Sequence, residues 1–201
     1  MTTPAGVAEQ LDHDLHVVEA ITANLKTYLL GESIYCPLSK VRPAAHQLPQ
    51  GTLGGLLSRL HRLRGMREHL TPEQRRTLEE AQAEADEQLK RWAVQAEQLA
   101  AREARARAGS WLRYVEELEA APRTYAPEYP TQARTRTALA LLLSFLGDAA
   151  GDATNRMRAA DELLKTLPAA HQFVWPEPFR AAYPEREFWW LYLKPLPEEG
   201  D

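Results

Sequence analysis

A stretch of about fifty residues without proline is the feature that most constrains the fold of this chain. From Glu73 to Ala121 most residues are Ala, Glu, Gln, Arg or Leu, which are strong helix formers. Thr71-Pro72-Glu73-Gln74 combines a cap residue, a proline at the first helical position and a capping-box partner. We therefore predict one helix over about 72–121. A continuous helix of this length would span roughly 75 Å, longer than a compact domain of this mass is wide.

The apolar residues of this stretch repeat at coiled-coil-like spacing, with one extra four-residue step that would locally relax a supercoil. They are Leu78, Ala81, Ala85, Leu89, Trp92, Ala96 and Leu99. Gly109 leaves two alternatives open: one bent rod, or two helices that meet there in a hairpin. The rod is preferred because glycine inside a helix costs only about 1 kcal/mol. We predict that Leu78, Leu89, Trp92 and Leu99 form a partner or oligomer face and that the chain self-associates as a dimer.

Apolar periodicity predicts four further helices, over about 6–30, 52–70, 130–146 and from Asp148 or Asp152 to 167. Thr52 is expected to cap the second of these, and Gly147 to close the third. A connection over 32–51 with three prolines separates the first two. The fold class is thus all-α: an elongated helical bundle with one long central helix. Because 201 residues suit one core, we predict a single helical domain over 1–201.

The C-terminal segment, residues 169–201, holds eight of the sixteen aromatic residues and is punctuated by prolines. Disordered tails are poor in aromatics, so we expect this segment to cover the core of the bundle. Trp189 and Trp190 are neighbours and point to opposite sides in a helix or a strand. One of these two side chains is therefore a candidate to contact a partner.

Composition restricts the function classes. The net charge of −4 gives no overall attraction to nucleic acid or to anionic membranes. The longest apolar run, at residues 138–143, is too short to span a bilayer, and Cys36 is the single cysteine. These features predict a protein of the reducing cytoplasm.

The patterns of known catalytic and metal sites are weak or missing. His13 and His16 lie three apart, but Asp12 and His16 have the spacing of an ordinary surface pair on a helix. Neither Glu-x-x-His nor His-Glu-x-x-His occurs, which removes support for di-iron and zinc sites. The glycines at 51, 54 and 55 lack the lysine of a phosphate loop, and Cys36 has no basic neighbour. We predict no cofactor and no metal.

An arginine-rich helix provides the one basic surface. The stripe consists of Arg59, Arg62, Arg64, Arg67, Arg75 and Arg76. It could contact a nucleic-acid backbone or another anionic partner. Glutamates at 73, 79, 80 and 84 favour the alternative that these arginines form ion pairs within the protein. The sequence therefore predicts a non-enzymatic interaction or scaffold protein, with nucleic-acid binding as the second hypothesis and an enzyme as the third.

Overall fold

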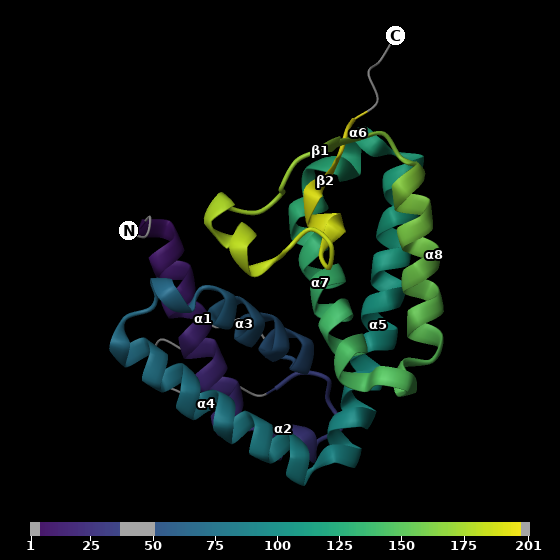
Figure 1. Ribbon diagram of the computed structural model, residues 1–201. Coiled ribbons are helices and arrows are strands. Elements are labelled where there is room, and N and C mark those ends of the chain that lie inside the picture. The colour runs from purple at the N-terminus through teal and green to yellow at the C-terminus, as the bar shows by residue number, and fades with distance from the viewer. Residues whose placement is uncertain (1–4, 37–50, 198–201) are drawn as a thin grey trace. The chain divides into compact units, whose positions relative to one another are not determined.

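The computed structural model describes residues 5–36 and 51–197 and is mostly helical, which confirms the all-α prediction (Figure 1). The α-helices are α1 (Ala5–Ala23), α2 (Leu25–Leu29), α3 (Leu53–Gly65), α4 (Pro72–Arg91), α5 (Ala93–Ala120), α6 (Pro122–Tyr125), α7 (Tyr129–Leu146) and α8 (Asp152–Thr166). Short 3-10 helices are η2 (Arg67–His69), η3 (Ala126–Glu128), η4 (Gly147–Ala150), η5 (Glu177–Ala182) and η6 (Trp189–Tyr192). Strands β1 (Ala169–His171) and β2 (Leu193–Pro195) form a small antiparallel sheet.

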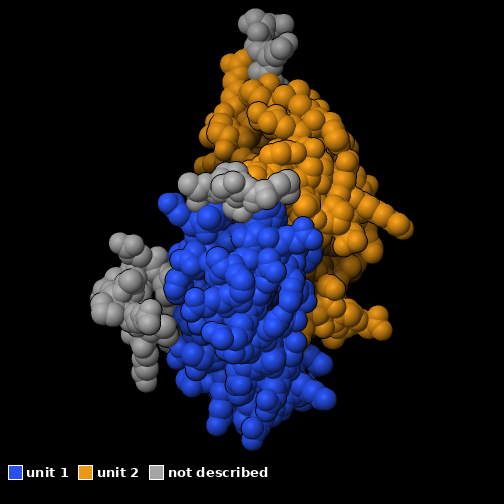
Figure 2. Space-filling view, turned by 60° about the vertical axis from the view of Figure 1, so that its left-hand side comes forward, with its two compact units in different colours: residues 1–102 blue, residues 103–201 orange. Residues whose placement is uncertain are grey.

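The chain divides into two compact units, residues 1–102 and residues 103–201 (Figure 2). The sequence predicted a single domain and shows no linker near residue 102, because the division falls inside the continuous helix α5. Among the described residues, no helix is both long and apolar enough to cross a bilayer.

The first unit is built on α1, which packs against α3 and α4, while α2 packs against α4. Its apolar interior includes Leu11, Val18 and Ile21 of α1. Both predicted caps are confirmed: Thr52 Oγ1 accepts from the Gly55 N–H at 2.9 Å, and Thr71 forms the capping box with Gln74. The helix predicted over 6–30 is interrupted at Asn24, and α2 ends at Leu29.

A hydrogen-bonded clasp holds the two ends of the connection between α2 and α3. The Tyr28 hydroxyl donates to the Ile34 carbonyl at 2.8 Å and accepts from the Leu53 N–H at 3.0 Å. The Cys36 N–H donates to the Gly51 carbonyl at 2.7 Å. Cys36 is buried, and burial raises the pKa of its thiol to about 11, which agrees with a core role rather than a nucleophilic one. Most of the predicted connection, residues 37–50, lies outside the described residues.

The prediction of one helix over 72–121 is wrong at Trp92. There ψ reaches 41°, α4 ends and the chain turns into α5 (Figure 1). The Trp92 N–H still donates to the Gln88 carbonyl at 3.0 Å, and the Trp92 carbonyl accepts from the Ala96 N–H at 2.9 Å. The non-helical conformation of this one residue therefore redirects the chain with little loss of backbone hydrogen bonding. Helix propensity does not predict such a break.

The helix does continue through Gly109, as the rod alternative predicted, so a hairpin at this glycine is wrong. Ala104, Ala108, Trp111 and Val115 are buried along this part of α5. Packing of this face keeps the helix intact although glycine disfavours it.

The second unit combines the C-terminal part of α5 with α7, α8 and the segment after α8. Gly147 ends α7 as predicted, with φ of +53°. The predicted aspartate cap of α8 is wrong, because Gly151 takes the cap position with φ of +53° and makes no side-chain cap. Asp152 lies in the first turn and pairs with Arg156 at 2.7 Å.

The prediction that the aromatic segment belongs to the core is confirmed by the burial of its rings. The buried aromatic residues are Phe173, Phe179, Tyr183, Phe188, Trp190 and Tyr192. Several pack edge to face, with centroid separations of 5.1 Å for Tyr183–Phe188 and 5.5 Å for Phe188–Trp190. The segment also forms β1 and β2, which the sequence did not predict.

Candidate functional site

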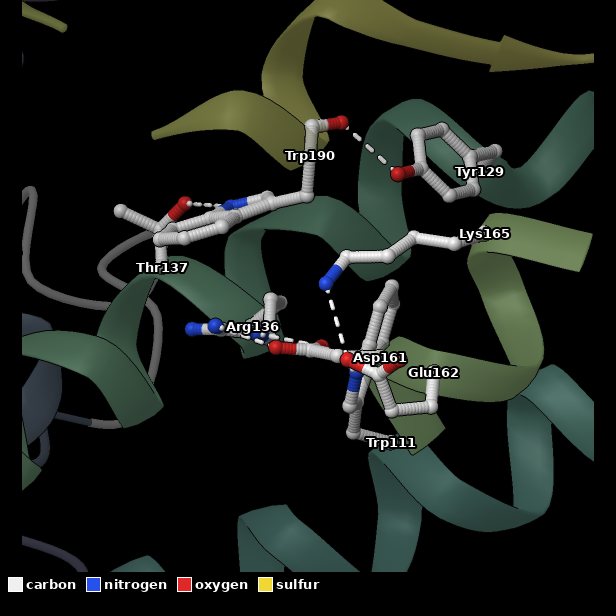
Figure 3. A network of polar contacts seen from close by, with 8 residues as sticks. All are labelled: Trp111, Tyr129, Arg136, Thr137, Asp161, Glu162, Lys165 and Trp190. Carbon is white, nitrogen blue, oxygen red and sulfur yellow. Dashed lines mark hydrogen bonds and ion pairs between the residues drawn. The ribbon is translucent and has the colours of Figure 1, made fainter. Parts of the chain in front are cut away.

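A buried polar network ties three helices of the second unit together (Figure 3). Arg136 of α7 donates from Nε and Nη2 to the two carboxylate oxygens of Asp161 on α8, at 2.9 and 2.7 Å. Trp111 of α5 donates from Nε1 to Asp161 Oδ1 at 3.0 Å. Arg136 and Asp161 are only 4% and 6% exposed. A bidentate pair in this environment fixes the relative positions of the two helices.

The same network holds the aromatic segment on α7 through Trp190. The Arg136 guanidinium lies 3.7 Å from the centroid of the Trp190 ring, and the indole Nε1 donates to Thr137 Oγ1 at 3.0 Å. The Trp190 carbonyl accepts from the Tyr129 hydroxyl at 2.7 Å. Burial raises the pKa of Tyr129 well above its ordinary value, so this phenol remains a donor. Trp190 thus anchors η6 on α7 and positions the residues before and after η6.

Strands β1 and β2 run next to this anchor, with Ala170 paired to Lys194 and His171 paired to Leu193. The antiparallel pairing continues past β1, because the Gln172 N–H donates to the Tyr192 carbonyl at 2.9 Å. The Val174 N–H donates to the Leu191 carbonyl at 2.9 Å, so residues 169–174 stay hydrogen-bonded to the returning chain. Two surface pockets lie along these residues, one beside 169–171 and the next beside 172–174.

The first, which we call the His171 pocket, has a volume of about 280 Å³. It is lined by Ala169, Ala170, His171, Glu185, Trp189, Tyr192 and Leu193. His171 Nε2 lies 2.8 Å from Glu185 Oε1, and its ring stacks on Tyr192 with centroids 6.1 Å apart. Trp189 is half-buried, and Lys165 Nζ lies 5.0 Å from the centroid of its ring. Lys165 also forms an ion pair with Glu162 at 2.9 Å.

The second, the Trp175 pocket, has a volume of about 300 Å³. Its walls are Ala126, Pro127, Tyr129, Pro130, Gln172, Phe173, Val174, Trp175 and Lys194. Trp175 is held in place because its Nε1 donates to the Pro130 carbonyl at 2.8 Å and its ring packs edge to face on Tyr183. Lys194 is exposed and forms no ion pair within the described part of the chain. The pocket therefore combines an apolar floor with one available positive charge.

Some residues of the predicted partner face lie in the core, and others lie at the surface. Leu78 and Leu89 are buried on α4, which packs on α1, α2 and α3, and Leu99 is buried on α5. These leucines therefore face the interior. Trp92 is half-buried at the turn between α4 and α5. Of the tryptophan pair, Trp190 is the buried anchor and Trp189 lines the His171 pocket. Trp189 is thus the member of this set that lies at a candidate site.

The predicted arginine stripe is largely engaged with groups of the first unit. Asp14 of α1, 1% exposed, lies 3.5 Å from Arg59 Nε and 3.3 Å from Arg62 Nη1. Arg67 pairs with Glu79, and Arg76 Nε lies 4.0 Å from Glu80. The Arg75 guanidinium donates to the carbonyls of Arg67 and Glu68. Arg64 is exposed. The internal ion pairs that the sequence offered as the alternative are therefore present.

Metal-ligating residues do not gather in the described part of the chain. His16 Nδ1 lies 3.4 Å from Asp12 Oδ2, the surface pair that the spacing indicated. Within residues 5–36 and 51–197, no group of three or more His, Cys, Asp or Glu side chains is placed to hold a metal ion.

Comparisons with models of protein families, with curated proteins and with solved structures each found no match.

Sequence reasoning missed the residues that build the site. Arg136 and Asp161 lie 25 positions apart on different helices, and no local spacing links them. Lys194 and Val174 become neighbours in one pocket only because the segment folds back on itself. The concentration of aromatics after residue 168 was the one available signal, and it indicated the region rather than the residues.

Proposed function

We propose that this protein is a non-enzymatic helical protein that acts by binding another protein through its C-terminal segment. The observation that carries the proposal is the pair of pockets along residues 169–174, with walls that are mainly aromatic and aliphatic. Aromatic residues are enriched in the centres of protein interfaces because each buries a large area at low entropic cost.

The dimensions of the two pockets favour side chains of a partner over a free small molecule. Volumes of about 280 and 300 Å³ lie at the lower end of the range for ligand sites. The His171–Glu185 pair could in principle hold or move a proton, but these side chains are 72% and 54% exposed. A general base in such a wet position lacks the shielding that tunes catalytic groups.

The first prediction concerns Trp189, the accessible half of the tryptophan pair. A partner captured by the immobilised full chain from its source cells, then purified and titrated, should bind the Trp189→Ala variant at least about thirtyfold more weakly, as expected for a hot spot of about 2 kcal/mol. Tyr35→Ala is the matched control, because Tyr35 is an aromatic residue of the first unit that is 48% exposed. Equal affinity of the wild type and the Trp189 variant for every captured protein would count against the proposal.

Nucleic-acid binding through the arginine stripe is the second candidate function. Within the described residues, Arg64 is an exposed arginine of the stripe for which the structure shows no ion pair, and Arg75 donates to backbone carbonyls. Because most of the stripe is engaged, we expect filter binding to give weak retention of DNA or RNA at 50 mM salt and none at 200 mM. Tight retention at both concentrations, lost in Arg64→Glu, would favour this candidate instead.

Self-association remains a proposal. The burial of Leu78, Leu89 and Leu99 means that a dimer has to use other side chains. Val94, 61% exposed at the start of α5, and the half-buried Trp92 are the apolar side chains available at that turn.

A further inference from the structure

The small sheet of the second unit has two edges, and their chemistry differs. In an antiparallel pair, residues alternate between those that bond across the pair and those whose backbone groups face outward. Leu196 bonds to Pro168 and Gln172 bonds to Tyr192, so Ala170 and Lys194, midway between these pairs, also bond across. The outward positions are therefore Ala169 and His171 on β1, and Leu193 and Pro195 on β2.

The outer edge of β2 is blocked, whereas the outer edge of β1 is open. Pro195 has no N–H, and its outward position explains why the ladder tolerates it. Prolines and charged residues are the usual means by which proteins protect sheet edges. Neither Ala169 nor His171 is a proline, and both are exposed. Their outward backbone groups make no hydrogen bond within the described residues. The edge of β1 can therefore pair with another strand.

The two pockets are lined by the strand that carries this open edge and by the residues that follow it. Residues 169–171 line the His171 pocket and residues 172–174 line the Trp175 pocket. A strand rises about 3.3 Å per residue, so a peptide of about six residues beside this segment reaches both pockets. Backbone pairing would supply affinity, and side chains in the pockets would supply selectivity.

The charge at the Trp175 pocket indicates the composition of the peptide. Lys194 lines this pocket without an ion pair in the described part of the chain. At the other pocket, Glu185 and His171 are paired with each other. A carboxylate of the peptide can therefore be neutralised by Lys194, while its apolar side chains contact the walls formed by Trp175 and Trp189.

We propose that the free edge of β1 binds an extended peptide of a partner protein by strand addition, and that this peptide carries apolar side chains and an acidic residue that pairs with Lys194. This inference rests on the proposed function and names the surface and the kind of partner. The free backbone edge of β1, the two adjacent pockets and the available lysine of β2 are three separate features of the C-terminal segment.

The test uses twelve-residue peptides displayed on phage and selected on the folded full chain, with the binders then synthesised and titrated. His171→Ala and His171→Pro form a matched pair, because both remove the imidazole but only the proline removes the outward N–H. We expect the proline variant to bind about five- to tenfold more weakly than the alanine variant, as expected for one backbone hydrogen bond. Melting curves establish that both variants are folded.

Two further measurements separate strand addition from other binding modes. N-methylation of single peptide amides should weaken binding at alternate positions only, because every second N–H faces the edge. Lys194→Glu should weaken the selected peptides about tenfold and favour versions in which the acidic residue is changed to lysine.

Several outcomes would overturn this inference and leave the proposed function to the Trp189 experiment. These are the absence of any selected binder, equal affinity for the two His171 variants, and binding that is insensitive to N-methylation and to Lys194→Glu. A dimer of the full chain that dissociates in His171→Pro but not in His171→Ala would also overturn it, because a second copy would then occupy the edge.

Discussion

Replacement of Asp161 with alanine is expected to destabilise the second unit by about 3–5 kcal/mol, since it leaves the buried guanidinium of Arg136 without its counter-charge. It also removes the acceptor of the Trp111 indole N–H. Typical domains are stable by about 5–15 kcal/mol, so this is a large share of the total. Urea unfolding followed by tryptophan fluorescence measures the change directly, because Trp111 and Trp190 both lie in the network.

Asp152→Ala is the matched control, because Asp152 pairs with Arg156 on the surface of the same helix with both side chains more than half exposed. It should cost less than about 1 kcal/mol. The double variant Arg136→Met with Asp161→Leu should recover much of the loss, since removal of both charges leaves neither of them buried alone. If Asp161→Ala and Asp152→Ala unfold at the same urea concentration, the network contributes nothing special to stability.

A chain truncated after Leu167 is expected to aggregate or to lose the cooperative unfolding of its second unit. Truncation removes six buried aromatic side chains, and loss of a single buried Phe or Trp side chain costs about 3–5 kcal/mol. It also uncovers Tyr129, Arg136 and Thr137 of α7, which bind Trp190 in the intact protein. Thermal unfolding by circular dichroism and hydrogen exchange of the α7 and α8 amides measure the effect.

Two point variants test the same segment without removing it, one with a large expected effect and one with a small effect. Trp190→Ala should lower stability by several kcal/mol, because it removes the ring over Arg136 and leaves the Thr137 contact without its donor. Leu196→Ala, at a position 43% exposed, should change stability by less than about 0.5 kcal/mol. A truncated chain that melts at the temperature of the full chain would mean that the segment adds nothing to the stability of the core.

Local signals in the sequence were sufficient for the start or end of several helices. Thr52 and the Thr71–Gln74 capping box begin their helices as predicted, because the side chain that satisfies the first N–H groups lies within three residues of them. Gly147 ends α7 because the positive φ there disfavours every other residue. The density of aromatics likewise predicted that 169–201 is folded, since such side chains seldom remain in water, and the burial of the rings within 169–197 agrees with this.

Tertiary packing decided everything that depends on partners distant in sequence. Trp92 interrupts a stretch of strong helix formers because α4 packs on α1, α2 and α3, and a difference of a few tenths of a kcal/mol in propensity does not oppose such packing. The division at residue 102 lies inside a regular helix and leaves no mark in composition. Leu78, Leu89 and Leu99 have the spacing of an oligomer seam, but a seam and a core face look alike until the neighbouring helices are placed.

The candidate site belongs to the same category. Helical periodicity identifies which side chains share a face, but not which faces meet, so the pairing of Arg136 with Asp161 could not be read from either helix. The strands β1 and β2 are three residues each, too short for an alternating pattern, and Trp190 holds the returning chain on α7 just before β2. The sequence by itself determined most of the helices and several of their ends. The open edge of β1 and its two pockets arise only when the segment folds back, because each requires atoms brought together from positions more than ten residues apart.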